Sequence, residues 1–183
     1  MPLEPITYQD FEKIKKKDPY FNGRWSYHAE AVRMVKHVKP ETVLEAGGNG
    51  VHIFKGSDDI DINKMIEPVI CHDLREVPWP VTKHYDLFIA LQVWEHLEGE
   101  QQKAFLEVMR ISDRALLSFP YKWINEGPRH SNNDMDVIRF WTLGVDPKAY
   151  VIHEPHGRLA MLIMYFEFDT ESIKKARKRA GLF

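Results

Sequence analysis

Hydrophobic residues along the chain follow two periods that alternate. Short apolar runs bounded by Gly, Pro, Asn or Asp are typical of β-strands. The nearly continuous apolar run at residues 85–91 is typical of a strand buried on both faces of a parallel sheet. Between these runs, apolar residues recur three and four positions apart, which predicts amphipathic helices. The predicted strands cover residues 42–46, 60–62, 69–71, 85–91, 115–119, 150–152 and 160–168.

Helix starts and stops follow from capping residues and prolines. Ser26 is expected to cap a helix that Pro40 stops, and Thr170 is expected to cap a basic helix at the end of the chain. Two further helices are predicted over residues 101–111 and 134–143.

Alternating strands and helices predict an α/β fold with a Rossmann-like, doubly wound, mostly parallel sheet. The last two predicted strands indicate an antiparallel hairpin at the C-terminal end. Only ten residues lie between Gly50 and Asp61, and eleven lie between Asp61 and Asp73. The crossover helices after the first and second strands are therefore expected to be shortened.

The composition is that of one ordinary domain, expected to span residues 1–183, with 44% hydrophobic residues and a formal net charge of -2. The longest apolar run, residues 160–166, is far shorter than the ~20 residues that cross a bilayer, so no membrane insertion is expected. The first residues lack the basic and apolar regions of a signal peptide, so no secretion is expected, and the single Cys71 fits a cytoplasmic protein. Cys71 lies in an apolar run and is expected in the core. Near-neutral charge argues against a nucleic-acid partner.

Polar residues follow four of the predicted strands. The first strand runs through Glu45 into a Gly-Gly-Asn-Gly turn, the second ends at Asp61, the third at Asp73 and the fourth at Gln92. Ligands of doubly wound sheets bind at the carboxyl ends of the strands. Acidic residues there suit a ligand with ribose hydroxyls, an exocyclic amine and a cationic part, whereas they would repel a diphosphate.

In these residues the chain resembles the class I S-adenosylmethionine-dependent methyltransferases, and most closely compact members associated with saccharide and polysaccharide biosynthesis. The resemblance covers residues 40–120 and rests on residues 43–50, 61–63, 72–80 and 85–97 in that order. It implies S-adenosylmethionine as the cofactor and methyl transfer to a small polar acceptor, such as a sugar or sugar-derived hydroxyl or amine. The implied segments are an N-terminal helical part, a cofactor-binding core, and an acceptor loop with the terminal hairpin and helix, over residues 1–40, 41–120 and 121–183.

The resemblance assigns five residues to the methionine part of the cofactor. The backbone at Gly47 and Gly48 would pass beneath it, and Glu45 would hold it through its ammonium group or through water. Leu91 and Gln92 would line the same end of the site.

Three further residues are assigned to the adenosine part. Asp61 would accept hydrogen bonds from the ribose hydroxyls, and Asp73 from the adenine amine, with the Leu74 amide beside the ring. The chain departs from the family at Asn49, where Gly is usual, although Asn tolerates a positive φ better than most residues.

Two histidines are candidates for the general base that an alcohol acceptor requires. His96 follows the fourth strand, and His130 lies in the long loop after the fifth. In the same loop, Tyr121, Trp123 and Arg129 can contact a sugar-like acceptor or simply close the loop over the core.

Other interpretations stay open. Asn49 and the reduced helices fit a catalytically inactive methyltransferase-like binding or assembly module, and a dinucleotide-dependent oxidoreductase is a weaker alternative. No metal is predicted, because the Asp59–Asp61 pattern is common by chance and Pro155 prevents a regular helix at residues 153–156. The aromatic residues between 20 and 27 are expected to be core rather than a cap on the cofactor. No feature indicates an oligomeric state.

Overall fold

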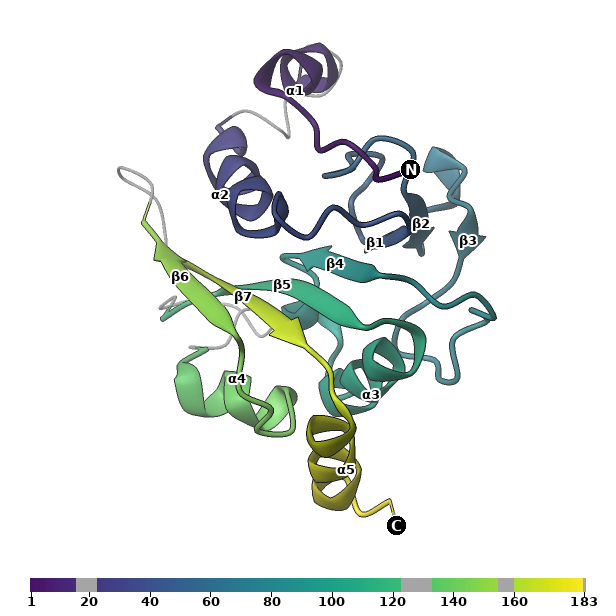
Figure 1. The fold of residues 1–183 in the computed structure, drawn as a ribbon, viewed down its shortest axis with the longest axis vertical. Helices are drawn as coiled ribbons and strands as arrows, with labels where there is room; N and C mark the ends of the chain where they lie inside the picture. Colours follow the sequence, from purple (N-terminus) through teal and green to yellow (C-terminus); the bar gives the residue numbers. More distant parts are fainter. Residues whose placement is uncertain (16–22, 123–132, 155–159, 183) are drawn as a thin grey trace.

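Seven strands form one mixed sheet in the computed structural model, which describes residues 1–15, 23–122, 133–154 and 160–182 (Figure 1). Their order across the sheet is β3-β2-β1-β4-β5-β7-β6. β1 to β5 run parallel, and β7 is antiparallel to both β5 and β6, which confirms the predicted fold class. The strands are β1 (Val43–Ala46), β2 (Asp58–Asp61), β3 (Ile70–Cys71), β4 (Leu87–Leu91), β5 (Arg114–Pro120), β6 (Ala149–His153) and β7 (Met161–Glu167).

Helices cover both faces of the sheet (Figure 1). One face is covered by α2 (Trp25–Val35), against which α1 (Tyr8–Lys15) packs with the Phe11 ring 5.3 Å from that of Trp25. The opposite face carries α3 (Gln101–Ile111), α4 (Met135–Trp141) and α5 (Thr170–Arg179). Within the described ranges, no helix is long and apolar enough to cross a bilayer.

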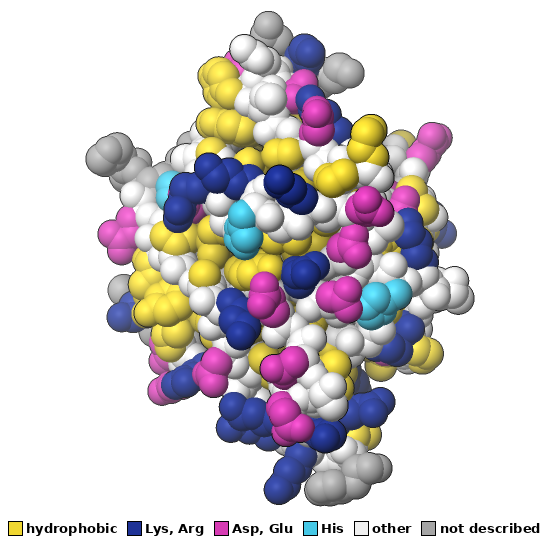
Figure 2. Space-filling view, viewed as in Figure 1, with side chains coloured by type: hydrophobic (Ala, Val, Ile, Leu, Met, Phe, Trp, Pro, Cys, Tyr) yellow, Lys and Arg dark blue, Asp and Glu magenta, His cyan; other side chains and the backbone are white. Residues whose placement is uncertain are grey.

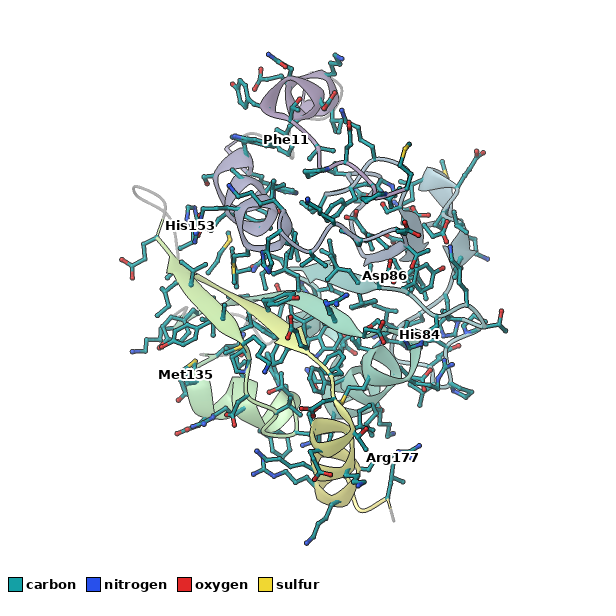
Figure 3. The ribbon with its side chains drawn as sticks, viewed as in Figure 1. Phe11, His84, Asp86, Met135, His153 and Arg177 are labelled. Atoms are coloured by element: carbon teal, nitrogen blue, oxygen red, sulfur yellow. The ribbon has the colours of Figure 1, made fainter. Side chains whose placement is uncertain are left out.

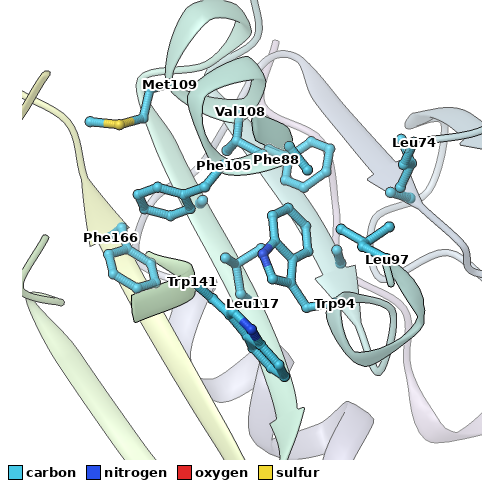
Figure 4. Close-up of a cluster of buried hydrophobic side chains, with 14 of the residues drawn as sticks. Leu74, Phe88, Trp94, Leu97, Phe105, Val108, Met109, Leu117, Trp141 and Phe166 are labelled. Carbon is cyan, nitrogen blue, oxygen red and sulfur yellow. The ribbon is translucent and has the colours of Figure 1, made fainter. Parts of the chain in front are cut away.

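Alternate residues of the central strands divide between these two faces. In β4, Leu87 and Ile89 join the cluster under α2, whereas Phe88 and Ala90 join the larger cluster under α3. The fully buried Trp94 lies in that larger cluster, with its ring 6.3 Å from that of Phe88 (Figure 4). Because both faces of β4 are buried, its nearly continuous apolar sequence is explained.

The two crossovers after β1 and β2 are shortened as predicted. No helix lies between β1 and β2, and only the single 3-10 turn η2 (Lys64–Ile66) lies between β2 and β3. In the first crossover, Ile53 and Phe54 are almost fully buried, and the Ile6 amide donates to the Ile53 carbonyl at 2.8 Å. Apolar burial and contacts with the N-terminal segment therefore replace the hydrogen bonds of a helix.

Three local predictions were wrong. Cys71 is exposed, because β3 is a two-residue strand at the edge of the sheet. Ser26 does not cap α2, which begins one residue earlier, after Arg24, with no side-chain cap. Asp169, not Thr170, caps α5, because its carboxylate accepts from the Ser172 amide while the Ser172 hydroxyl accepts from the Asp169 amide.

Candidate functional site

Two pockets adjoin at the carboxyl ends of β1 to β4, and Gly47 lines both. The large pocket, of about 350 Å³, falls within the size range of ligand sites. The small pocket, of about 60 Å³, lies between the glycine turn and the start of α2. The large pocket is lined by Gly47, Ile60, Asp61, Ile62, His72, Asp73, Leu74, Arg75, Val93, His96, Leu97 and Glu98. The small pocket is lined by Arg24, Tyr27, His28, Glu45, Ala46, Gly47, Gly48, Asn49, Val51, Ile53, Ile89, Leu91 and Gln92.

The glycine turn after β1 leaves no room for a side chain at its first two positions. Gly47 has a φ of +64°, and a Cβ there would lie 2.6 Å from Val93 Cγ2. A Cβ on Gly48 would lie 2.5 Å from the Val51 carbonyl oxygen. Asn49 adopts a φ of 48°, so the predicted tolerance of this residue for the turn is confirmed.

Asp61 joins the end of β2 to this turn. The side chain is buried, and its two oxygens accept from the Asn49 amide at 3.2 Å and the Asn63 amide at 2.8 Å. A third hydrogen bond, from Asn63 Nδ2 to Asn49 Oδ1 at 3.0 Å, connects the same two loops. Each carboxylate oxygen keeps acceptor capacity for a ligand in the large pocket.

Asp73, after β3, lies in the large pocket beside Leu74 but has a partner that the sequence analysis missed. The Arg75 guanidinium donates to both of its oxygens, at 2.6 Å for the shortest pair, and also to Glu98 at 3.0 Å. The hydrogen bonds from Arg75 hold the pKa of the Asp73 carboxyl below its ordinary value. The carboxylate predicted to meet the adenine amine is therefore already engaged by a cation at the pocket wall.

Glu45 forms part of the small pocket and also holds the shortened crossover. Its oxygens accept from the amides of Ile53 at 2.7 Å and Phe54 at 2.8 Å, and from the Ser57 hydroxyl at 2.9 Å. Burial raises the pKa of the Glu45 carboxyl to about 7, against the lowering effect of these three bonds. This structural role was missed, because sequence spacing does not show which amides approach a carboxylate.

Leu91 and Gln92, at the end of β4, lie on the wall of the small pocket. Gln92 adopts a φ of 59°, and its side-chain Nε2 donates to the Ser118 hydroxyl at 3.0 Å. This bond to β5 fixes the amide group in the wall of the small pocket.

Arg24, the residue before α2, and Tyr27 and His28 in its first turn also line the small pocket, and Arg24 and His28 were missed by the sequence analysis. Tyr27 and His28 are three and four positions after Arg24, and the three residues therefore lie on one face. From this spacing the sequence indicated only a helix. His28 Nδ1 donates to the Arg24 carbonyl at 2.8 Å, so Nε2 carries the lone pair in the neutral ring. Burial lowers the pKa of His28 to about 4, which keeps the ring neutral. Tyr27 is buried, as expected of a core residue, yet it also lines the pocket.

The two predicted bases lie in different situations. His96 is 51% exposed and lines the large pocket, and its Nε2 lies 3.9 Å from Glu95 Oε1. His130 lies outside the described residues, as do Trp123 and Arg129. In the part of the chain that is described, no three His, Cys, Asp or Glu side chains gather as a metal site.

The chain resembles known proteins in structure. No protein-family model and no curated protein sequence matches it. The N-methyltransferase NodS from Bradyrhizobium japonicum WM9, in complex with S-adenosyl-L-homocysteine, is 14% identical with a TM-score of 0.62, covering 87% of this chain and 97% of that chain. An S-adenosylmethionine-dependent methyltransferase from Clostridium acetobutylicum ATCC 824 is 9% identical with a TM-score of 0.61, covering 88% and 98%. The N-terminal domain of EvdMO1, in the presence of S-adenosyl-L-homocysteine and D-fucose, is 9% identical with a TM-score of 0.52, covering 79% and 83%. The fold is therefore that of S-adenosylmethionine-dependent methyltransferases.

Proposed function

We propose that the protein uses S-adenosylmethionine to methylate a small polar acceptor. The observation that carries this proposal is the pair of pockets that meet at Gly47. The large pocket, where Asp61 and Asp73 offer acceptors, would take a nucleoside, and the small polar pocket beside it would take the polar end of an amino acid. When bound there, the cofactor would supply a methyl group on a sulfonium, which is transferred by in-line displacement.

The adenosine part would lie in the large pocket. Asp61 would accept from the ribose hydroxyls with its remaining lone pairs, and Leu74 would lie beside the base. Asp73 would accept a hydrogen bond from the adenine amine, whether or not the Arg75 guanidinium stays bonded to it. The buried, charge-assisted acceptor at Asp61 makes this the residue on which binding depends most.

The methionine part would lie in the small pocket, over Gly47 and Gly48. Leu91 and Gln92 would line it, and Glu45 would meet its ammonium directly or through water. Arg24 lies on the same pocket wall and would attract its carboxylate. A neutral His28 Nε2 adds a hydrogen-bond acceptor at this end.

A sugar or sugar-derived hydroxyl or amine is the acceptor class we favour. The resemblance to compact methyltransferases of saccharide biosynthesis supports it, as does the presence of D-fucose in the EvdMO1 structure. The protein then has mainly to align the acceptor and to take up a proton, for which His130 and His96 are the candidates.

Calorimetry with S-adenosyl-L-homocysteine tests the proposal. Wild type is expected to bind, and Asp61→Ala is expected to abolish binding. The matched control is Asp58→Ala, which removes an acid from the other end of β2, where its carboxylate accepts from Lys83 and Tyr85 at 2.9 Å. Absence of heat from wild type at millimolar ligand would refute cofactor use.

A catalytically inactive binding module is the second candidate, and the engagement of Asp73 by Arg75 favours it. The two functions are distinguished by incubating protein with S-adenosylmethionine and a panel of sugars, amines and phenols. Binding without formation of S-adenosyl-L-homocysteine in any mixture favours the module, whereas turnover with one class of acceptor favours the enzyme.

A further inference from the structure

One edge of the sheet carries a surface that the cofactor site does not use. The sheet ends at β3 on one side and at β6 on the other. Edge strands are ordinarily kept short or protected by charged residues or proline. β3 has two residues, but β6 has five, and between Ala149 and His153 there is no Lys, Arg, Asp, Glu, Pro or Gly. His153 marks the end of β6 at the rim of the molecule (Figure 3).

The two faces of β6 differ. Val151 packs against the buried cluster under α2, whereas Tyr150 and Ile152 point to the opposite face and are 58% and 40% exposed. Hydrophobic side chains gather on the surface over β6 in the space-filling view (Figure 2). Lys148 and Glu154 flank the strand and are both exposed, and Lys148 lies near the Asp169 carboxylate that caps α5, on the side of the sheet to which Tyr150 and Ile152 point. The row therefore reads cation, aromatic, aliphatic, anion.

We propose that β6 pairs antiparallel with β6 of a second copy of this chain, across a two-fold axis at Val151. This register sets Tyr150 of each copy opposite Ile152 of the other, and Lys148 of each opposite Glu154 of the other. Aromatic and β-branched side chains, and opposite charges, are favourable cross-strand pairs. The contact is isologous and closes as a dimer.

Charge and shape both select this register. Moving the axis to Tyr150 would place Lys148 against Ile152, and moving it to Ile152 would place Tyr150 against Glu154. Either shift buries a charged group against an apolar one. Only the axis at Val151 pairs Tyr150 with Ile152 and also pairs Lys148 with Glu154, in both halves of the dimer.

Sedimentation of the full chain, up to about 100 µM, tests the dimer together with two charge reversals. Lys148→Glu and Glu154→Lys each place like charges opposite one another in their own homodimers. Each is expected to raise the dimer dissociation constant about tenfold or more. Mixing the two variants restores both opposite-charge pairs, so the mixture is expected to form heterodimers about as well as wild type forms homodimers.

Lys148 also lies near the Asp169 carboxylate that caps α5, so its reversal can change the stability of the monomer. The unfolding temperature of each variant is therefore measured to separate this effect from loss of the dimer. A wild type that stays monomeric overturns the proposal. So does a wild-type dimer that both charge reversals leave intact, since it must then form through another surface. The outcome is independent of cofactor binding, which is followed separately with S-adenosyl-L-homocysteine.

Discussion

The Glu45 carboxyl, which holds the crossover between β1 and β2, is expected to make folding stability depend on pH. Burial raises its pKa from the ordinary 4.5 to about 7. Because the folded pKa lies above the unfolded one, the folded protein binds this proton more tightly. The stability that Glu45 contributes is therefore fully present below about pH 4.5 and is lost as the pH rises through about 7. The difference between the two pKa values corresponds to about 3 kcal/mol.

Glu45→Gln isolates this effect, because glutamine has the shape of the neutral acid. Unlike that acid, whose hydroxyl oxygen can still accept, its Nε2 cannot accept, so one of the amides of Ile53 and Phe54 loses its acceptor at a cost of about 1 kcal/mol at every pH. At about pH 5 the variant and wild type are expected to unfold with free energies within about 1 kcal/mol of each other. At about pH 8 the variant is expected to be more stable by about 2 kcal/mol, because removal of the ionisable group gains about 3 kcal/mol and the lost hydrogen bond costs about 1 kcal/mol. Urea unfolding followed by tryptophan fluorescence measures both values.

Two further variants complete this test. Glu41→Gln alters a 66% exposed glutamate that pairs with the N-terminal ammonium, and is expected to change stability by no more than about 0.5 kcal/mol at either pH. Glu45→Ala leaves the amides of Ile53 and Phe54 without an acceptor, and is expected to lower stability at about pH 5 by about 2–4 kcal/mol. A difference between wild type and Glu45→Gln that does not change with pH would refute the reasoning.

Three other variants test the site. Gly47→Ala is expected to abolish S-adenosyl-L-homocysteine binding in calorimetry and to lower stability by about 1–3 kcal/mol. The control is Gly181→Ala, where φ is a similar +73° but nothing lies within 4 Å of the added Cβ. It is expected to show only backbone strain and normal binding. Arg75→Gln is expected to raise affinity for the same ligand up to about fivefold, because it frees the partly exposed Asp73 carboxylate; a loss of affinity would show that the guanidinium contacts the ligand. His28→Gln is expected to remove a loss of stability on acidification, which in wild type begins below about pH 6.5 and is complete below about 4, as urea midpoints across that range would show.

The sheet was predictable because its hydrophobic pattern is local. The run at β4 indicated a strand buried on both faces, and the strand-end positions of Asp61 and Asp73 followed from the topology rule for doubly wound sheets. The helix from Gln101 to Ile111 was predicted with the bounds that it has. Capping was less predictable, because Asp169 and Thr170 are both good caps and only the reciprocal bonds with Ser172 decide between them.

The partners and surroundings of individual side chains could not be predicted in the same way. The pattern of α2 showed an apolar face but not that Arg24 and His28 close the small pocket. Nothing in the spacing of Asp73 and Arg75 showed that the guanidinium turns back onto the carboxylate. Cys71 was misplaced because a strand's apolar sequence does not show whether it lies at the centre or the edge of the sheet.

The missing helix after β1 also discriminates between ligands. Dinucleotide-binding folds place the diphosphate at the N-terminus of the helix that follows the glycine turn, where backbone amides and the helix dipole attract negative charge. Residues 47–57 are all described and contain no helix, and the amides of Ile53 and Phe54 are turned onto Glu45 instead. A diphosphate would therefore meet a buried carboxylate and find no helix terminus. S-adenosylmethionine carries a sulfonium and an ammonium group and no phosphate, so it does not need a helix N-terminus. The shortened crossover therefore favours S-adenosylmethionine over a dinucleotide.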